Sequence, residues 1–391
     1  MSNFRREWLF SLIIALICLI LSFLDLAGIP SAPNGLHARG QVIAVDNSQV
    51  RQNLIVRTED QFLTVKLMNG PHEGKILELT NILTGKMELD EFYAVGDKVL
   101  VEYSIVKGQP DHGLARGHYR LELQLLLVGL FAVLLLAIAG VTGLKALLSF
   151  AFSALVLWKL FFPLLLRGFP PIPTGLAVVA ILTGVITFSV GGINRRGVST
   201  FIGSMLGIFL TCGLAVFFSK GFMLSGAIRP FAETLLYSGY YWLKLNDIFI
   251  ASVFIACSGA VMDLAMDIAA SMDEIKNKHP EISTLEHIRS GLKVGRAVVG
   301  TMTTTLLLAY SSSHLTMFLL FMAKGLPAAN IFNASFVAAE ILNILVGSFG
   351  LVTVAPFTAL IAGFLYRSRS EASTNSAISH APTTNPAEQH A

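Results

Sequence analysis

The stretch LELQLLLVGLFAVLLLAIA, residues 121–139, decides the fold, because it runs for 19 residues with a single charge, at Glu122. A helix of that length and composition can cross the hydrocarbon core of a bilayer. The whole chain has the same character: 54% of its 391 residues are hydrophobic and 14% are charged, with a mean hydropathy of +0.67. A soluble domain carries about 25% charged residues. The sequence therefore predicts a polytopic helical membrane protein.

Nine further apolar runs give an estimate of ten spans, with eight to ten as the range because the last runs are short and rich in glycine. They are 8–26, 144–166, 173–193, 198–218, 248–270, 297–313, 315–329, 332–349 and 351–366. We expect residues 1–27 to form an uncleaved N-terminal membrane anchor and residues 121–367 the multi-span helical domain. Residues 368–391 are too polar to bury a core and are expected to be a disordered cytoplasmic tail.

Residues 28–120 stand apart, since they hold 21 of the 53 Asp, Glu, Lys and Arg residues. Short segments in which apolar and polar residues alternate, at 41–45, 54–56, 62–67, 76–79 and 98–103, are separated by turn-forming residues such as Asn69-Gly70-Pro71. About five short strands predict a small β-barrel of the OB type. The segment lacks a basic groove with interleaved aromatics, so no nucleic-acid partner is expected, and docking or assembly is favoured over catalysis. Its aromatic residues, Phe62 among them, are as well explained by a core.

Basic residues in the short loops set the orientation through the positive-inside rule. Those expected on the side of Arg5 and Arg6 are Lys145, Arg195, Arg196, Lys276, Lys278, Arg289, Lys293, Arg367 and Arg369. Both termini are therefore expected in the cytoplasm of a multi-pass bacterial cell-membrane protein, with residues 28–120 extracytoplasmic. Four bases, including Arg229, fall on the opposite side and weaken the bias.

Charges inside spans cost several kcal/mol unless they are paired or hydrated. Asp263 and Asp267, four residues apart, share one helical face, and Glu340 is expected near the middle of its span. Arg296 at the mouth of another span is the expected partner of opposite sign. These four residues are the predicted proton-relay or ion-coupling set.

Polar residues near these charges suggest the wall of a hydrated path. Thr301, Thr303 and Thr304 follow Arg296, and Asn343 lies on nearly the same face as Glu340. Alternatives stay open at each position: Asp267 as a solvated helix end, Asp263 and Glu340 as a structural buried pair, and threonines bonded to their own backbone.

The stretches 70–81, 96–99, 258–274 and 295–306 carry a resemblance. With them the chain resembles the YibE/F family of bacterial multi-spanning proteins, and its extracytoplasmic insert makes it similar to the YibE-type member. The resemblance implies a possible partner of the shorter YibF type, which lacks the insert.

A second, local resemblance covers 266–277 and 290–306, which are similar to the SecF membrane region of the RND-like export proteins. Asp267 and Asp273 match the spacing of an intramembrane aspartate and an exit aspartate, and Arg296 with Thr303 and Thr304 matches the next helix. The resemblance implies that Asp267 carries the proton and Arg296 is its charge partner. The large paired periplasmic domains of those transporters are missing.

Three functions are weighed. The first is a proton- or ion-coupled permease or export-assisting subunit, acting on a small ion or exported substrate. The second is a non-catalytic scaffold that pairs with a YibF-like subunit or with itself. An intramembrane aspartyl protease is third and disfavoured. Such enzymes carry their two aspartates on facing helices, whereas Asp263 and Asp267 share one helix. No soluble catalytic, metal-binding or cofactor-binding pattern occurs, so we expect no enzyme, no metal and no cofactor.

Overall fold

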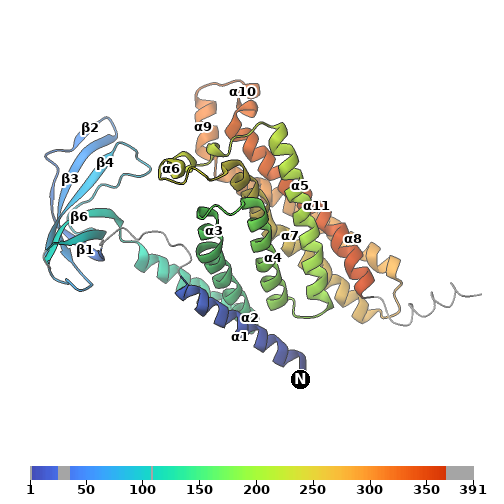
Figure 1. Cartoon of the computed structure of the whole chain (residues 1–391). Coiled ribbons are helices and arrows are strands. Elements are labelled where there is room, and N and C mark those ends of the chain that lie inside the picture. Colours follow the sequence, from blue (N-terminus) through green and yellow to red (C-terminus); the bar gives the residue numbers. More distant parts are fainter. Residues whose placement is uncertain (1, 25–35, 107–108, 367–391) are drawn as a thin grey trace, which may run out of the picture. The chain divides into compact units, whose positions relative to one another are not determined.

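The computed structural model describes residues 2–24, 36–106 and 109–366, with side chains from residue 8 onward. The expected tail at 368–391 lies outside these residues. The chain divides into two compact units, Gly28–Ile138 and Met1–Ala27 with Ala139–Ala391. We call the strands of the first the β-domain and the helices of the second the membrane unit (Figure 1).

The β-domain is a closed five-stranded barrel with one short extra strand. Its strands are β1 (Leu36–Asp46), β2 (Arg51–Asn53), β3 (Val56–Leu67), β4 (Ile76–Thr84), β5 (Lys98–Val106) and β6 (Gln109–His118). The order β1-β5-β6-β4-β3 closes through the β1–β3 pairing, and only β4 and β6 run parallel. The predicted OB-type barrel is therefore confirmed.

Gly40 allows β1 to serve both sides of the barrel. It lies opposite Leu67 of β3 and Val99 of β5. A Cβ atom at Gly40 would lie 2.2 Å from Val65 Cγ1 and 2.8 Å from Val101 Cγ2. Because real side chains do not approach that closely, only glycine fits where the strand passes from one partner to the other.

Two predicted features of this domain are wrong. The alternating segment at 54–56 lies mainly in the turn between β2 and β3, and β6 falls after the last predicted strand segment, 98–103. The β6 sequence, QPDHGLARGH, has no alternation and contains Pro110. It pairs along barrel strands that already exist, so tertiary context supplies what local sequence does not.

The membrane unit is helical throughout its described part. Its elements are α1 (Ser2–Phe23), the end of α2 (Leu121–Val156), the π-helical turn η1 (Leu157–Phe161), α3 (Phe162–Leu166), α4 (Pro171–Val190), α5 (Arg195–Gly221), the 3-10 turn η2 (Gly226–Ile228), α6 (Ala232–Tyr237), α7 (Leu245–Lys278), α8 (Thr284–Ser312), α9 (Leu315–Ala323), α10 (Ala328–Asn333) and α11 (Ser335–Leu365). Each long element is apolar and satisfies its own backbone hydrogen bonds, as a bilayer requires.

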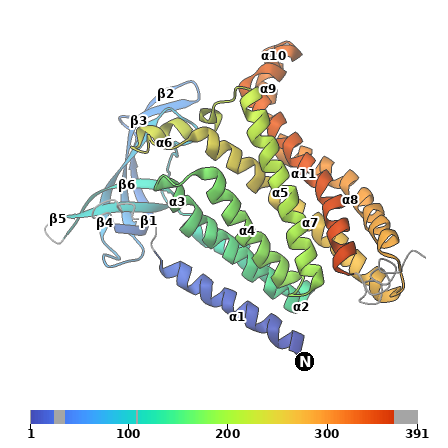
Figure 2. The same ribbon diagram turned by 45° about the vertical axis from the view of Figure 1, so that its right-hand side comes forward.

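Small residues bring α5, α7, α8 and α11 together, and Figure 2 shows α5 and α11 side by side. A Cβ atom at Gly350 of α11 would lie 2.0 Å from Thr211 Oγ1 of α5, and one at Gly203 would lie 2.2 Å from Thr358 Oγ1. The glycines thus permit close backbone approach, as in other membrane helix pairs. Around them lies the main core, which includes Phe254 and Val354.

The span estimate is too high. In the described residues five helices are long and apolar enough to cross a membrane, or six if the bent pair α8–α9 forms one span, and Trp8–Phe23 is a shorter apolar helix. Apart from its first residues, which end α10, the run 332–349 joins the run 351–366 in one helix, α11, which continues past Gly350 and Pro356. Neighbouring helices in a membrane tolerate such residues, so neither ends the span.

Helix α2 and its continuation form an apolar run of 46 residues, Leu121–Leu166. At 1.5 Å per residue this would measure about 69 Å, more than twice a hydrocarbon core of about 30 Å. Gly140 divides it, with φ 52° and ψ −125°. This left-handed conformation is open to glycine at little cost, so the break falls between the predicted runs 121–139 and 144–166.

Candidate functional site

Asp263 and Asp267 lie on one exposed face of α7. The opposite face of the helix is buried in the main core by residues such as Leu264 and Ile268. Four residues of helix separate the two carboxylates by about 6 Å along the axis. Asp263 is the 19th of the 34 residues of α7. Two acidic groups thus occupy the outer surface of the bundle in the central part of an apolar helix.

Arg296 lies on an exposed face of α8 and pairs with neither aspartate. Gly291 and Gly295 fix the packing of this helix. A Cβ atom at Gly291 would lie 2.4 Å from Met272 Sδ of α7, and one at Gly295 would lie 2.8 Å from Ala355 Cβ of α11. Arg296 follows Gly295 by one residue, about 100° around the helix, and is exposed. No ion pair of Arg296 is found among the described residues, so the expected contact between it and the two aspartates is absent there.

The α8 threonines bond to the backbone of their own helix. Thr301 Oγ1 donates to Val298 O at 2.9 Å, Thr303 Oγ1 to Val299 O at 3.0 Å, and Thr304 Oγ1 to Thr301 O at 3.1 Å. Such bonds satisfy a hydroxyl inside a bilayer without a partner helix. Thr301 and Thr304 are nevertheless exposed on α8, as is Arg296.

Glu340 is buried in the membrane unit, at 5% exposed. Its carboxylate accepts a hydrogen bond from Arg229 Nη1 at 2.6 Å, and His314 Nε2 lies 3.5 Å away. Arg229 also lies over the Phe249 ring, 5.2 Å from its centroid. The expectation that Glu340 stands mid-span is wrong, because α11 begins at Ser335 and places it in the second turn.

Asn343 lies one turn further along α11 and lines a hollow of about 470 Å³. Asn343 is 6% exposed, and its Oδ1 atom has no hydrogen-bond partner among the residues that the structure describes. Most of the lining is apolar and comes from α6 and α7, with Arg229 at one side. The structure therefore groups Glu340 and Asn343 with Arg229 at one end of the membrane unit. Asp263, Asp267 and Arg296 lie outside that group.

Sequence reasoning missed Arg229 and His314 as members of the Glu340 group. An intramembrane carboxylate demands a partner of opposite sign, so some cation was to be expected. Arg229 lies 111 residues before Glu340, and His314 stands at the bend between α8 and α9. Neither separation follows a helical repeat, so only the folded chain identifies them.

Together these observations define a multi-pass helical membrane protein that carries a small OB-type barrel on its N-terminal side. Comparison with known protein families identifies the family. The family model described as YibE/F-like protein matches residues 127–368, and the family model described as YibE/F family N-terminal domain matches residues 37–113. The chain belongs to the YibE/F family. No curated protein matches it, and no solved structure matches it.

Proposed function

We propose that this protein is a subunit of a proton-coupled permease or export system, with Asp263 and Asp267 as its proton-binding groups. The observation that supports the proposal is the exposed aspartate pair on α7, which forms no ion pair within the described chain. A carboxylate in a low-dielectric setting binds protons more readily than one in water. Two such groups one turn apart can share a proton and pass it along the helix.

The exposure of the pair implies a second chain. In lipid, two carboxylates and a guanidinium on an outer surface would each cost several kcal/mol. A covering chain, either a second copy or a YibF-like subunit, would remove them from lipid and could bring Arg296 of one chain to the aspartates of the other. Small side chains on the same α7 face, such as Ala256 and Gly259, allow close approach.

The proposed topology places both termini in the cytoplasm and the β-domain outside, and it counts α1 and the two halves of α2, divided at Gly140, as three separate crossings. Successive helices alternate direction, so the α4–α5 turn, the α7–α8 turn and the end of α11 share one side. Six described bases lie at these places, namely Arg195, Arg196, Lys276, Lys278, Arg289 and Lys293. The positive-inside rule supports a cytoplasmic location for that side. The proposal includes no catalytic residue, metal or cofactor.

Proton flux into reconstituted vesicles tests the coupling role. Vesicles containing the protein, a trapped pH dye and an imposed pH gradient should acidify faster than empty vesicles, and Asp267→Asn should return the rate to background. Glu274→Gln is the matched control, because Glu274 is an exposed carboxylate on α7 that pairs with Lys278 at 3.0 Å. Equal rates for Asp267→Asn and the unsubstituted protein would exclude the role.

A non-catalytic scaffold is the second candidate, and the exposed charged face also supports it. Two differently tagged copies, or this chain with a YibF-like protein, should then co-purify from nanodiscs. Loss of that co-purification on Asp263→Ala, with no proton flux in any preparation, would favour the scaffold. Retained assembly with lost flux would favour coupling.

A further inference from the structure

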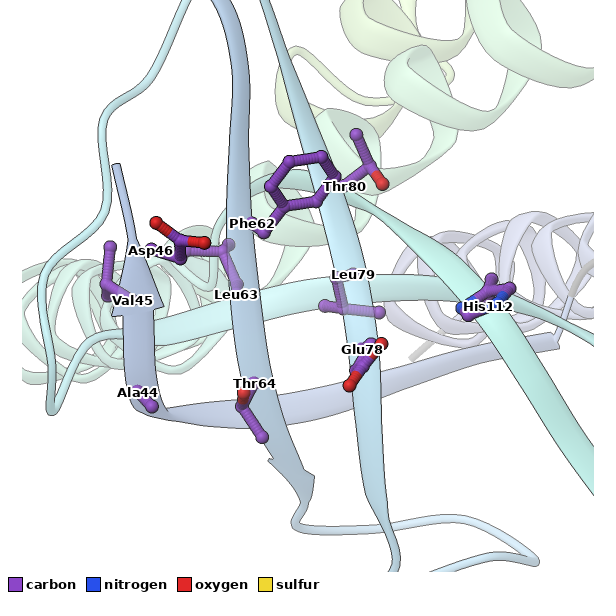
Figure 3. Close-up of a pocket in the computed structure, with 10 residues that line it drawn as sticks. All are labelled: Ala44, Val45, Asp46, Phe62, Leu63, Thr64, Glu78, Leu79, Thr80 and His112. Atoms are coloured by element: carbon purple, nitrogen blue, oxygen red, sulfur yellow. The ribbon is translucent and has the colours of Figure 1, made fainter. Parts of the chain in front are cut away.

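The outer face of the β-domain carries a hollow that the membrane function leaves unused. It measures about 580 Å³ and is lined by β1, β3, β4 and the start of β6 (Figure 3). In barrel order β3 and β4 are the second and third strands, and the face over those two strands is where OB barrels hold extended ligands.

Strand register explains the composition of this hollow. Asp46, Phe62 and Thr80 pair across β1, β3 and β4 to form one row. The next row, with Leu63 and Leu79, faces the core because side chains alternate along a strand.

Ala44, Thr64 and Glu78 pair across the same strands and form the second outward row, two residues further along each strand. Figure 3 shows both rows, with His112 beyond β4. The small Ala44 side chain leaves open space beside Thr64. The hollow therefore presents a ring face, two carboxylates, two hydroxyls and an imidazole.

This set of groups selects against phosphates. None of the described residues that line the hollow is a lysine or an arginine, and Asp46 and Glu78 would repel a nucleic-acid backbone. Hydrogen bonds from the backbone N–H of Ser48, at 2.8 Å, and from its side chain lower the pKa of Asp46, so that carboxylate stays ionised near neutral pH. The described residues also hold no group of three His, Cys, Asp or Glu side chains that could bind a metal ion.

We propose that this hollow is a saccharide-binding site. The partly exposed Phe62 side chain offers an apolar platform for the C–H face of a sugar. Carboxylate oxygens of Asp46 and Glu78 accept hydrogen bonds from sugar hydroxyls, and the Thr64 and Thr80 hydroxyls can donate or accept them. A core position explained Phe62 as well as a binding role did, but Tyr93 and Tyr103 fill the core, and Phe62 remains on the outer face.

Titration of the full-length protein in phospholipid nanodiscs tests the site. Nanodiscs are required because glycoside detergents carry sugar headgroups that would compete. Chitotetraose, a neutral acetamido sugar, is the probe, and saturation-transfer NMR reports the contact. Phe62→Ala should raise the dissociation constant for chitotetraose about tenfold, which corresponds to roughly 1.4 kcal/mol of binding free energy. Glu78→Gln should raise the dissociation constant by a smaller factor.

Phe92→Ala is the matched control, since Phe92 lies outside the hollow beneath Arg57, 3.8 Å from the guanidinium carbon to the ring centroid. It should leave chitotetraose binding unchanged. Sedimentation with an insoluble cell-wall glycan shows whether a polymer is bound as well as a free sugar. The proposal is overturned if chitotetraose gives no saturation transfer, if Phe62→Ala and Phe92→Ala behave alike, or if spermine displaces the sugar at equal concentration, which would make the site one for cations.

Discussion

Replacing Arg229 by leucine is the sharpest test of the charge group at the end of α11. The substitution leaves the Glu340 side chain, 6% exposed, without its partner at 2.6 Å. Removing one member of a buried ion pair costs about 3–5 kcal/mol. The Arg229 side chain is 31% exposed, so we expect the lower end, about 3 kcal/mol. At about 2–4 °C per kcal/mol for a unit of this size, the midpoint of thermal unfolding should fall by about 6–12 °C.

The companion variants separate an ion pair from lost packing. Glu340→Leu should cost less than Arg229→Leu, because the stranded arginine can turn toward water whereas the stranded carboxylate cannot. The double variant should recover most of the loss, since two apolar side chains leave no buried charge. The assay is thermal unfolding in nanodiscs followed by tryptophan fluorescence. Arg167→Leu, at an exposed arginine beside α3, is the control. A double variant as unstable as Arg229→Leu would refute the reasoning.

Three further predictions concern packing and protonation. Gln61→Leu orphans the buried N–H and C=O groups of Tyr93, at about 1–3 kcal/mol each, so hydrogen exchange in β3 and β4 should accelerate while α7 is unaffected. Burial opposes ionisation of Glu91, but hydrogen bonds from His118 N–H and Arg120 outweigh it and lower its pKa. The stability of the β-domain should therefore fall as the pH drops below about 4.3, the ordinary glutamate pKa. Glu91→Gln should reduce this dependence of stability on pH, as measured by circular dichroism. Gly350→Leu should prevent assembly of α5 against α11 and abolish a monodisperse peak in size-exclusion chromatography.

The architecture followed from sequence wherever a pattern was local. Long apolar runs identified the membrane helices, and alternation between turn signals identified most barrel strands. The exceptions have physical causes. Residues of β6 carry no strand signal because their pairing partners define them, and Gly350 was expected to end a span because glycine is a weak helix former outside a packed membrane bundle.

The charged residues divide in the same way. Helical spacing was enough to place Asp263 and Asp267 on one face, because that relation lies within one element. It could not show that Arg296 forms no ion pair with them among the described residues, since α8 is oriented by the packing of Gly291 and Gly295. Long-range pairs such as Glu340 with Arg229 depend on the packing of several helices, which no short sequence pattern encodes.

Closure of the barrel through β1 and β3 also limits how the β-domain can recognise anything. Its five principal strands all have neighbours on both sides, and the extra strand β2 covers three exposed residues, Arg51–Asn53. In the described barrel, the only strand with a fully free edge is therefore the three-residue β2, which offers a guest peptide little to extend by strand addition. The β-domain must therefore recognise a ligand with its own side chains and loops. That makes binding sensitive to point substitutions on the outer face, and it protects neighbouring copies from joining edge to edge.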